Sequence, residues 1–207
     1  MKTNILLKTT ALLLALIARS ASAAIVTTED FSTDIGVTDR DGIINATYDG
    51  GNDWMTGSFS LQMFPVPQQD AFVITDPDFT GDYSGNGVTQ FSFQMFAVNV
   101  VPSDLFIRIV DGANVFSYQF NPIIGMLNNW QTFTVDLAYS FGWSGGESAF
   151  NTALTSVDSI EIQITRSGTA AQEYRLDNLQ TFDTPLNNGG GGGPSAVPEP
   201  NTISFVA

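Results

Sequence analysis

Carboxylates are the most abundant side chains in this sequence that are capable of chemistry. The chain has 21 Asp and Glu residues against seven Lys and Arg, and it has no His and no Cys. The lack of His and Cys excludes imidazole bases, thiolate nucleophiles, disulfides and the usual zinc and haem ligands. Acid–base chemistry by carboxylates, metal binding by oxygen ligands, and ligand contact by aromatic or hydrogen-bonding side chains remain.

Most of the acidic residues lie in sequences typical of turns. Sixteen of them are Asp, and many stand beside Gly, Asn or Pro, as in Asp41-Gly42 and Asp76-Pro77. Asp accepts hydrogen bonds from the backbone that follows it in such turns, which explains most of these positions. Calcium coordination is the alternative, and we restrict it to at most one cluster.

Two carboxylates in predicted strands are candidates for an acid–base pair. Glycosidases use two carboxylates at a fixed separation, one of them with a pKa raised by burial. Asp136 and Glu161 each stand between apolar neighbours, so alternation turns both toward the outer side of their strands. A solvated strand face is the simpler interpretation. We therefore assign no catalytic residue.

Aromatic residues in polar loops are candidates for sugar contacts, because aromatic rings stack on the apolar faces of sugars. Trp54 follows an Asp-Gly-Gly-Asn-Asp loop, Tyr83 lies within Gly-Asp-Tyr-Ser-Gly-Asn, and Trp143 is flanked by Gly142 and Gly145. These three are the candidate glycan contacts, with Trp54 first. The alternative for each ring is a place in the core.

The elements that must position these side chains are short β-strands. Apolar residues alternate with polar ones over five stretches, a period that gives each strand one buried face. The alternating residues are Phe91, Phe93 and Met95; Leu105, Ile107 and Ile109; Phe116, Tyr118 and Phe120; Phe133, Val135 and Leu137; and Ile160, Ile162 and Ile164. Further strands are predicted at 43–48, 58–64, 71–75 and 173–182. Together they predict an all-β, antiparallel β-sandwich of the jelly-roll type.

One stretch, residues 146–157, predicts a short helix. Its apolar residues from Ala149 to Val157 fall on one face of two or three turns. We expect this helix to cross one end of the sandwich as a lid over the core rather than to bind a ligand.

The two ends of the chain differ from its middle. Residues 1–23 carry Lys2 and Lys8, a short apolar run and a final Ala-Ser-Ala, which together predict a secretory signal peptide. Residues 24–183 form the predicted sandwich domain. Residues 184–196 form a linker that contains five consecutive glycines.

Removal of the signal peptide leaves a strongly acidic chain. Four arginines, no lysine and 21 acidic residues remain, which gives a net charge of −17. This charge repels phosphate and anionic lipid, so we expect no nucleic acid, no nucleotide and no membrane surface as partner. Neutral glycans and divalent cations are the ligands that this charge favours.

Residues 197–207 resemble the start of a PEP-CTERM sorting signal. Val197, Pro198, Glu199 and Pro200 match the Pro-Glu-Pro motif of that family and its common preceding residue. The resemblance implies an exported protein of a Gram-negative bacterium, processed by an exosortase-type membrane protease that recognises a hydrophobic segment and a basic cluster. Only seven residues follow the motif, fewer than the roughly 20 that span a bilayer, so the segment is truncated or belongs to a degenerate member that is released.

The middle of the chain resembles laminin IV or laminin B type jelly-roll modules and the wider group of galactose-binding-like sandwiches. The resemblance spans residues 29–182. It is carried by Glu29-Asp30-Phe31, the run from Phe79 to Ser84, Trp130, Trp143, and the run from Tyr174 to Leu179. It implies a noncatalytic architecture for adhesion or carbohydrate recognition.

The same resemblance implies a structural calcium site. Many jelly-roll binding modules hold a calcium ion between their first and last strands, and Glu29 or Asp30 and Asp177 occupy the matching places. Such an ion would stabilise the folded state by linkage. The alternative is that Asp177 shapes the end of a strand and Glu29 is solvated. We expect no other cofactor.

Taken together, the residues predict an exported structural or adhesive protein of the cell surface or of the extracellular polysaccharide matrix, without catalytic activity. The alternative is a carbohydrate-binding module that recognises a specific glycan. Extracellular polysaccharide or glycan and the exosortase-type protease are the expected partners. A recognition module should carry an aromatic-lined concave groove on one sheet, which a matrix protein does not require.

Overall fold

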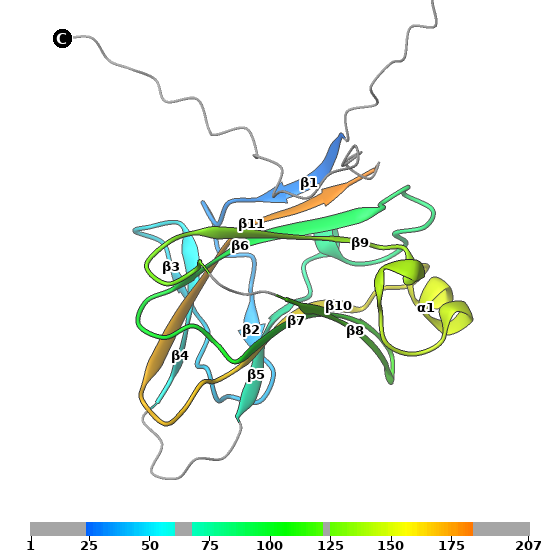
Figure 1. Ribbon diagram of the computed structural model, residues 1–207. Helices are drawn as coiled ribbons and strands as arrows, with labels where there is room; N and C mark the ends of the chain where they lie inside the picture. Colours follow the sequence, from blue (N-terminus) through cyan, green and yellow to red (C-terminus); the bar gives the residue numbers. More distant parts are fainter. Residues whose placement is uncertain (1–23, 61–67, 122–124, 184–207) are drawn as a thin grey trace, which may run out of the picture.

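Two antiparallel β-sheets stack face to face in the computed structural model of the protein (Figure 1). The structure describes residues 24–60, 68–121 and 125–183. The predicted signal peptide, Gly-rich linker and sorting segment lie outside the described residues. The two sheets and the short helix beside them confirm the predicted all-β sandwich.

The six-stranded sheet has the order β3-β4-β11-β6-β9, and β1 pairs with β11 beside this path. Its long strand β11 pairs with β4 through its first half and with β1 through its second half, while β6 lies along its other edge. The strands are β1 (Ile25–Glu29), β3 (Thr47–Asp49), β4 (Trp54–Phe59), β6 (Gln90–Ala97), β9 (Gln131–Asp136) and β11 (Gln172–Phe182).

The five-stranded sheet has the order β2-β5-β10-β7-β8, with β10 at its centre. In Figure 1 its strands β7 and β8 arch, and the hollow side of the arch faces away from the six-stranded sheet. The strands are β2 (Thr38–Asp39), β5 (Gln69–Ile74), β7 (Asp104–Asp111), β8 (Asn114–Phe120) and β10 (Ser159–Thr165).

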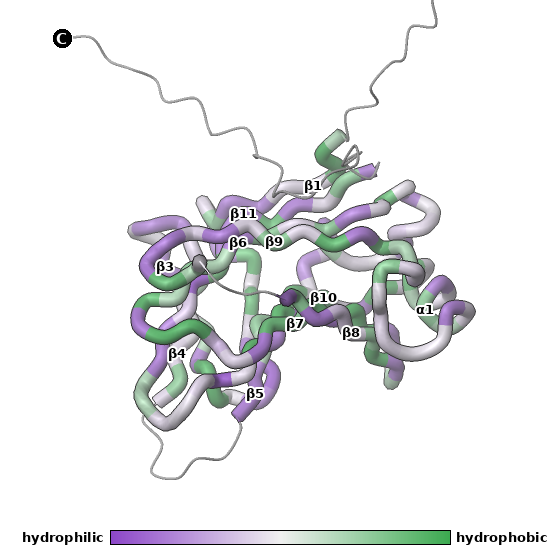
Figure 2. The backbone as a smooth tube through the Cα atoms, in the orientation of Figure 1, coloured by the Kyte–Doolittle hydropathy of each residue, from purple (hydrophilic) through white to green (hydrophobic). Residues whose placement is uncertain are grey.

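The hydrophobic core lies between the two sheets and is built from the alternating residues. Phe91, Phe93 and Met95 of β6 are fully buried, and so are Ile160, Ile162 and Ile164 of β10. Figure 2 shows the resulting change between hydrophilic and hydrophobic residues along the strands. Phenylalanine rings fill much of the core, with Phe93 stacked on Phe133 at a centroid distance of 5.4 Å. Burial of these rings stabilises the fold, and no disulfide adds to it because the chain has no cysteine.

The predicted helix is present as α1 (Glu147–Ala153) at one end of the sandwich. Its buried Phe150 packs against the rings of Phe116 and Trp143, at centroid distances of 5.5 and 4.9 Å. Val157 is also buried, whereas Ala149 is exposed, so the apolar face is narrower than predicted. Two 3₁₀ turns, η1 (Pro77–Phe79) and η2 (Tyr139–Phe141), complete the regular structure of the described residues.

Two predicted strands have different bounds in the structure. The strand expected over residues 43–48 is reduced to β3, because the backbone N–H groups of Ile43 and Ile44 donate to the carboxylate of Asp70. The strand expected to start at residue 58 begins at Trp54, and part of its predicted range lies outside the described residues. Within the described residues, no helix has the length and apolar character needed to cross a membrane.

Candidate functional site

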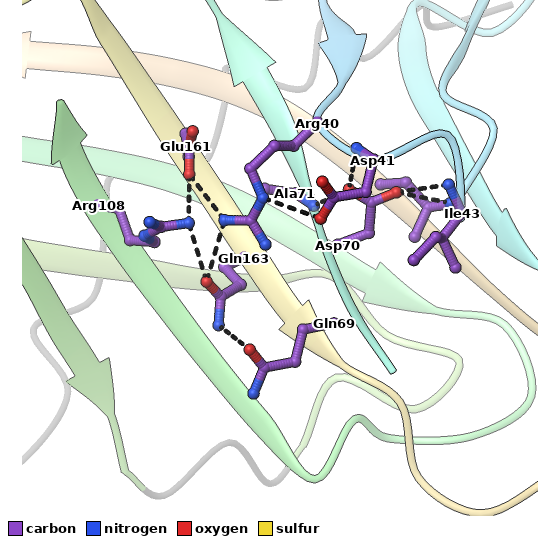
Figure 3. A network of polar contacts seen from close by, with 10 residues as sticks. Arg40, Asp41, Ile43, Gln69, Asp70, Ala71, Arg108, Glu161 and Gln163 are labelled. Carbon is purple, nitrogen blue, oxygen red and sulfur yellow. Dashed lines mark hydrogen bonds and ion pairs between the residues drawn. The ribbon is translucent and has the colours of Figure 1, made fainter. Parts of the chain in front are cut away.

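A network of charged and amide side chains lies on the outer face of the five-stranded sheet. Alternation along β10 turns its isoleucines toward the core and therefore places Glu161 and Gln163 on the opposite face. The register places Arg108 of β7 beside Glu161, since these two residues are direct cross-strand partners. Arg40, which directly follows β2, reaches the same carboxylate from the other side of β10 (Figure 3).

The ion pairs of this network are short and share one oxygen. Glu161 Oε2 lies 2.6 Å from Nη1 of Arg108 and 3.0 Å from Nη1 of Arg40. The amide oxygen of Gln163 accepts from the same two nitrogens at 3.1 and 3.3 Å. The Gln163 amide then donates to Oε1 of Gln69 at 3.1 Å, which extends the network along the sheet. We call Arg40, Arg108, Glu161 and Gln163 the arginine network.

Burial and charge act in opposite directions on Glu161. Burial raises the pKa of its carboxyl group above the usual value, and the adjacent Arg40 guanidinium offsets only part of this rise. The side chain of Glu161 is 9% exposed, whereas those of Arg40 and Arg108 are 25% and 16% exposed. The carboxylate is thus enclosed by the two cations, while the guanidinium groups keep donors at the surface.

A buried carboxylate fixes the loop that carries Arg40. Asp70 is fully buried, and its two oxygens accept four backbone N–H groups, those of Asp41, Ile43, Ile44 and Ala71, at 2.7 to 3.0 Å. The backbone of Arg40 is held in turn, because its N–H donates to the carbonyl of Ala71 at 3.1 Å. The sheet therefore presents the Arg40 guanidinium in a defined position.

The arginine network was only partly visible in the sequence. Glu161 was expected to be solvated, and that expectation was wrong, because the residue is 7% exposed and enclosed by arginines. Arg40, Arg108 and Gln163 were not selected as functional residues. The one signal in the sequence was the small number of arginines, since only four follow residue 23. In the structure, two of these four donate to one carboxylate.

The two carboxylates considered for catalysis do not share a groove. Asp136 ends β9 of the six-stranded sheet and accepts from the Gln90 amide at 2.7 Å, whereas Glu161 belongs to the five-stranded sheet. Each lies on the outer face of its own sheet, so the core separates them. The glycosidase arrangement of two facing carboxylates is therefore absent for this pair.

Two of the three predicted sugar contacts are wrong, because their rings are buried. Tyr83 is 2% exposed, and its hydroxyl donates to the carbonyl of Phe79 at 2.6 Å. Trp143 is 4% exposed, and its indole N–H donates to the carbonyl of Asp136 at 2.9 Å. The hydroxyl and the indole N–H each donate to a backbone carbonyl, so the two rings can be buried without an unpaired polar group. Neither ring can stack on a ligand.

Trp54, the first choice, is partly exposed, and it lies on the outer face of the six-stranded sheet. Its ring centroid is 5.9 Å from that of Trp130, and the guanidinium carbon of Arg175 lies 4.7 Å from its centroid. Trp54 is thus remote from the arginine network, on the opposite side of the sandwich.

The predicted calcium ligands do not form a cage. Within residues 24–60, 68–121 and 125–183, no group of three or more acidic residues is placed to hold a metal ion. Glu29 accepts from the backbone N–H of Phe31 at 2.5 Å, and Asp30 from that of Ser32 at 3.0 Å. Both oxygens of Asp177 accept from Asn178. A site made by two of these carboxylates and backbone carbonyls stays a prediction.

A shallow hollow lies beside α1. It is lined by Glu147, Ser148, Asn151, Thr152 and Thr155, which are exposed polar residues of one short segment. Its lining contains no aromatic ring. We assign no binding role to it.

No protein-family model matches the chain, and no curated protein matches it. Solved structures are similar to the chain at low identity, and they include the following three. The agarase AgWH50C is 20% identical, with a TM-score of 0.56 over 79% of this chain and 25% of its own. PfGH50B is 13% identical, with a TM-score of 0.52 over 77% of this chain and 24% of its own. CtCBM11, a family 11 carbohydrate-binding module from Clostridium thermocellum, is 13% identical, with a TM-score of 0.50 over 80% of this chain and 98% of its own.

The coverage of these structures differs. The chain spans about a quarter of the length of AgWH50C and PfGH50B, and nearly the whole of CtCBM11. At such identities the likeness shows the β-sandwich fold that this chain shares with these proteins.

Proposed function

We propose that this chain is a noncatalytic polysaccharide-binding module and that the arginine network is its glycan contact. The observation that carries the proposal is the arginine network itself: two arginines, a glutamate and a glutamine lie side by side on the outer face of a sheet. Guanidinium and amide donors with a carboxylate acceptor suit the paired hydroxyl groups of a sugar ring. The similarity in fold to a carbohydrate-binding module and to part of an agarase supports this choice.

The face that carries the network has further features suited to a sugar chain. The hollow side of the arch formed by β7 and β8 faces outward there. Phe106, a partly exposed ring, is the cross-strand partner of Gln163 and offers an apolar surface beside the polar groups. Asp41 pairs with Arg40 at 3.1 Å and completes the balance of two positive and two negative charges. We expect a neutral rather than an acidic polysaccharide.

Export is part of the same proposal. The signal-peptide pattern in residues 1–23 and the PEP-CTERM-like residues 197–207 support a place at the cell surface or in the extracellular polysaccharide matrix. A glycan-binding domain in that setting would act as an adhesive component, which unites both functions predicted from the sequence. The exosortase-type protease remains a proposed partner.

The test is binding of the purified chain to neutral polysaccharides, for which agarose, xylan and mixed-linkage β-glucan are suitable probes. Arg108→Ala should weaken binding by at least about tenfold, since a hydrogen bond to a charged group contributes about 1.5 to 3 kcal/mol. Arg108→Lys should restore part of it, because lysine keeps the charge but loses the planar fork. Asn151→Ala, on the exposed side of α1, is the matched control. Undiminished binding by folded Arg108→Ala would reject this site.

A further inference from the structure

A second cluster of partly exposed side chains lies on the outer face of the six-stranded sheet. We call Trp54, Phe96, Trp130 and Arg175 the tryptophan cluster. Arg175 of β11 is the cross-strand partner of Phe96 on β6. Trp54 is the first residue of β4, and Trp130 directly precedes β9. The register of four strands therefore brings these side chains to one surface.

The tryptophan cluster is closely packed around the Arg175 guanidinium. Its guanidinium carbon lies 4.7 Å from the Trp54 centroid and 5.3 Å from the Phe96 centroid. The Trp130 centroid lies 5.5 Å from that of Phe96. Glu173 holds the guanidinium in place, with Oε1 accepting from Nη2 at 3.1 Å. The rings are thus arranged before any ligand arrives, which reduces the entropy lost on binding.

The core does not explain these rings. None of the three is part of the hydrophobic core formed by the described residues, and each is partly exposed. Their neighbours on the same face are polar, as expected for the solvent side of a sheet, and include Thr56, Gln94 and Thr132. The third tryptophan of the chain, Trp143, is buried. Two tryptophans have therefore been placed where burial gains little, which favours a role in recognition.

One buried polar atom of the cluster has no hydrogen-bond partner among the described residues. The indole nitrogen Nε1 of Trp54 is shielded from solvent and has no hydrogen-bond acceptor within the described residues. Such a donor is costly to leave unpaired.

The charges around the tryptophan cluster restrict the class of ligand. Asp49 is the cross-strand partner of Trp54, Asp53 precedes it, and Asp177 pairs with Gln94 on the same face. These carboxylates repel acidic chains and accept hydrogen bonds from hydroxyl groups. A neutral, hydroxyl-rich chain with apolar ring faces is complementary to such a surface.

We propose that the tryptophan cluster is a second saccharide-binding surface, so that one domain binds two neutral polysaccharide chains, one on each outer face. Binding at the tryptophan cluster stands without the arginine network, whereas crosslinking of two chains rests on the proposed function as well. The domain would then connect polysaccharide chains in a matrix rather than only adhere to one.

The experiment compares four forms of the full chain: the natural sequence, Arg108→Ala, Trp130→Ala, and the double variant. The ligands are hexasaccharides of agarose, xylan and mixed-linkage β-glucan, with stoichiometry measured by titration calorimetry and indole emission followed in parallel. Trp130→Phe, which keeps a ring at this position, is the matched control. Thermal melting verifies that each variant is folded.

We expect two equivalents per natural chain and one for each single variant. Arg108→Ala should keep the change in indole emission, Trp130→Ala should lose it, and Trp130→Phe should retain affinity within about tenfold, about 1.4 kcal/mol. The natural chain, unlike either single variant, should raise the viscosity of a polysaccharide solution.

The failures of the two proposals differ. If the natural chain binds one equivalent of ligand, and Arg108→Ala abolishes this binding while Trp130→Ala does not, the second surface is overturned and the arginine network is retained. If the natural chain binds one equivalent that Trp130→Ala abolishes and Arg108→Ala does not, the tryptophan cluster is supported and the arginine network is rejected. Absence of binding to all three ligands would overturn both.

Discussion

Glu161 shows at the scale of a single residue how neighbours change the role of a side chain. It occupies a polar position in an alternating strand, which usually means a solvated surface group. Two guanidinium groups instead lie within 3.0 Å of one of its oxygens. The carboxylate therefore orders Arg40 and Arg108, and it acts as the central positioning residue of the proposed glycan site.

Glu161→Gln should lower the free energy of unfolding by about 1 to 2 kcal/mol, between the values for exposed and fully buried ion pairs. The physical reason is that two neighbouring cations lose their shared counterion. Urea unfolding measures the change. Glu173→Gln, in which the lost pair with Arg175 is more exposed, should cost less than about 1 kcal/mol. Equal costs for both variants would contradict this assignment.

Asp177 makes the stability of the folded protein depend on pH, and its surroundings determine the sign of this dependence. Burial and, to a smaller extent, the nearby Asp30, Asp53 and Glu29 raise the pKa of its carboxyl group to about 6, although the hydrogen bond from the backbone N–H of Asn178 lowers it. The folded protein thus holds this proton more tightly than the unfolded chain. The resulting stabilisation is complete below about pH 4 and is lost as the pH rises through about 6.

Asp177→Asn should therefore raise the Tm at pH 7.5 and change it little near pH 4. We expect a rise of about 2 to 4 °C, corresponding to about 1 kcal/mol after allowance for solvent screening of this partly exposed group. Thermal melts at the two pH values measure it. Asp34→Asn, in an exposed turn, controls for the loss of one negative charge, and a similar rise for that variant would contradict the explanation.

At the scale of elements, the loop between β2 and β3 shows how a side chain can replace a strand partner. The apolar residues Ile43 and Ile44 favour a strand, yet their N–H groups donate to Asp70 on β5. The loop is thereby tied to the sheet edge beside Arg40. A buried carboxylate can accept several backbone N–H groups and so replace the hydrogen bonds that a neighbouring strand would supply.

Asp70→Asn should destabilise the protein by about 2 to 4 kcal/mol, because one amide oxygen cannot accept from all four N–H groups. The amides of Asp41, Ile43 and Ile44 should exchange hydrogen faster, which mass spectrometry of peptide fragments can measure. Glycan affinity should fall as well, since Arg40 loses its fixed backbone. Unchanged exchange in this loop would contradict the role given to Asp70.

At the scale of the whole molecule, stability has to come from the core that the two sheets enclose. The chain has no cysteine, and its charge of −17 after residue 23 opposes compaction. Phenylalanine packing between the sheets and the antiparallel ladders offset this repulsion. The two outer faces remain available for ligands, one polar and one aromatic.

Removal of metal ions should leave the Tm unchanged, because Glu29, Asp30 and Asp177 already accept local hydrogen bonds. Melting curves in EDTA and in millimolar calcium measure this. A higher Tm in calcium that Asp177→Asn abolishes would restore the calcium site.

The amino-acid sequence by itself determined the elements and their inner faces. Alternation with a period of two is a local property, so the strands around Phe93, Ile107 and Ile162 and the burial of these residues could be predicted from it. The same holds for α1, whose apolar face follows from helical spacing. Turn chemistry likewise accounted for the many Asp residues.

Only the tertiary structure decided which outer side chains meet. Arg40 and Glu161 are 121 positions apart, and Arg108 and Glu161 are 53 apart, so strand order and register bring them together. Local sequence carries little information about register, since many pairings preserve the same alternation. The burial of Tyr83 and Trp143 and the exposure of Trp54 were decided in the same way. Aromatic residues in predicted loops cannot be told apart from the local sequence. Packing against distant strands determines which of their rings are exposed to solvent.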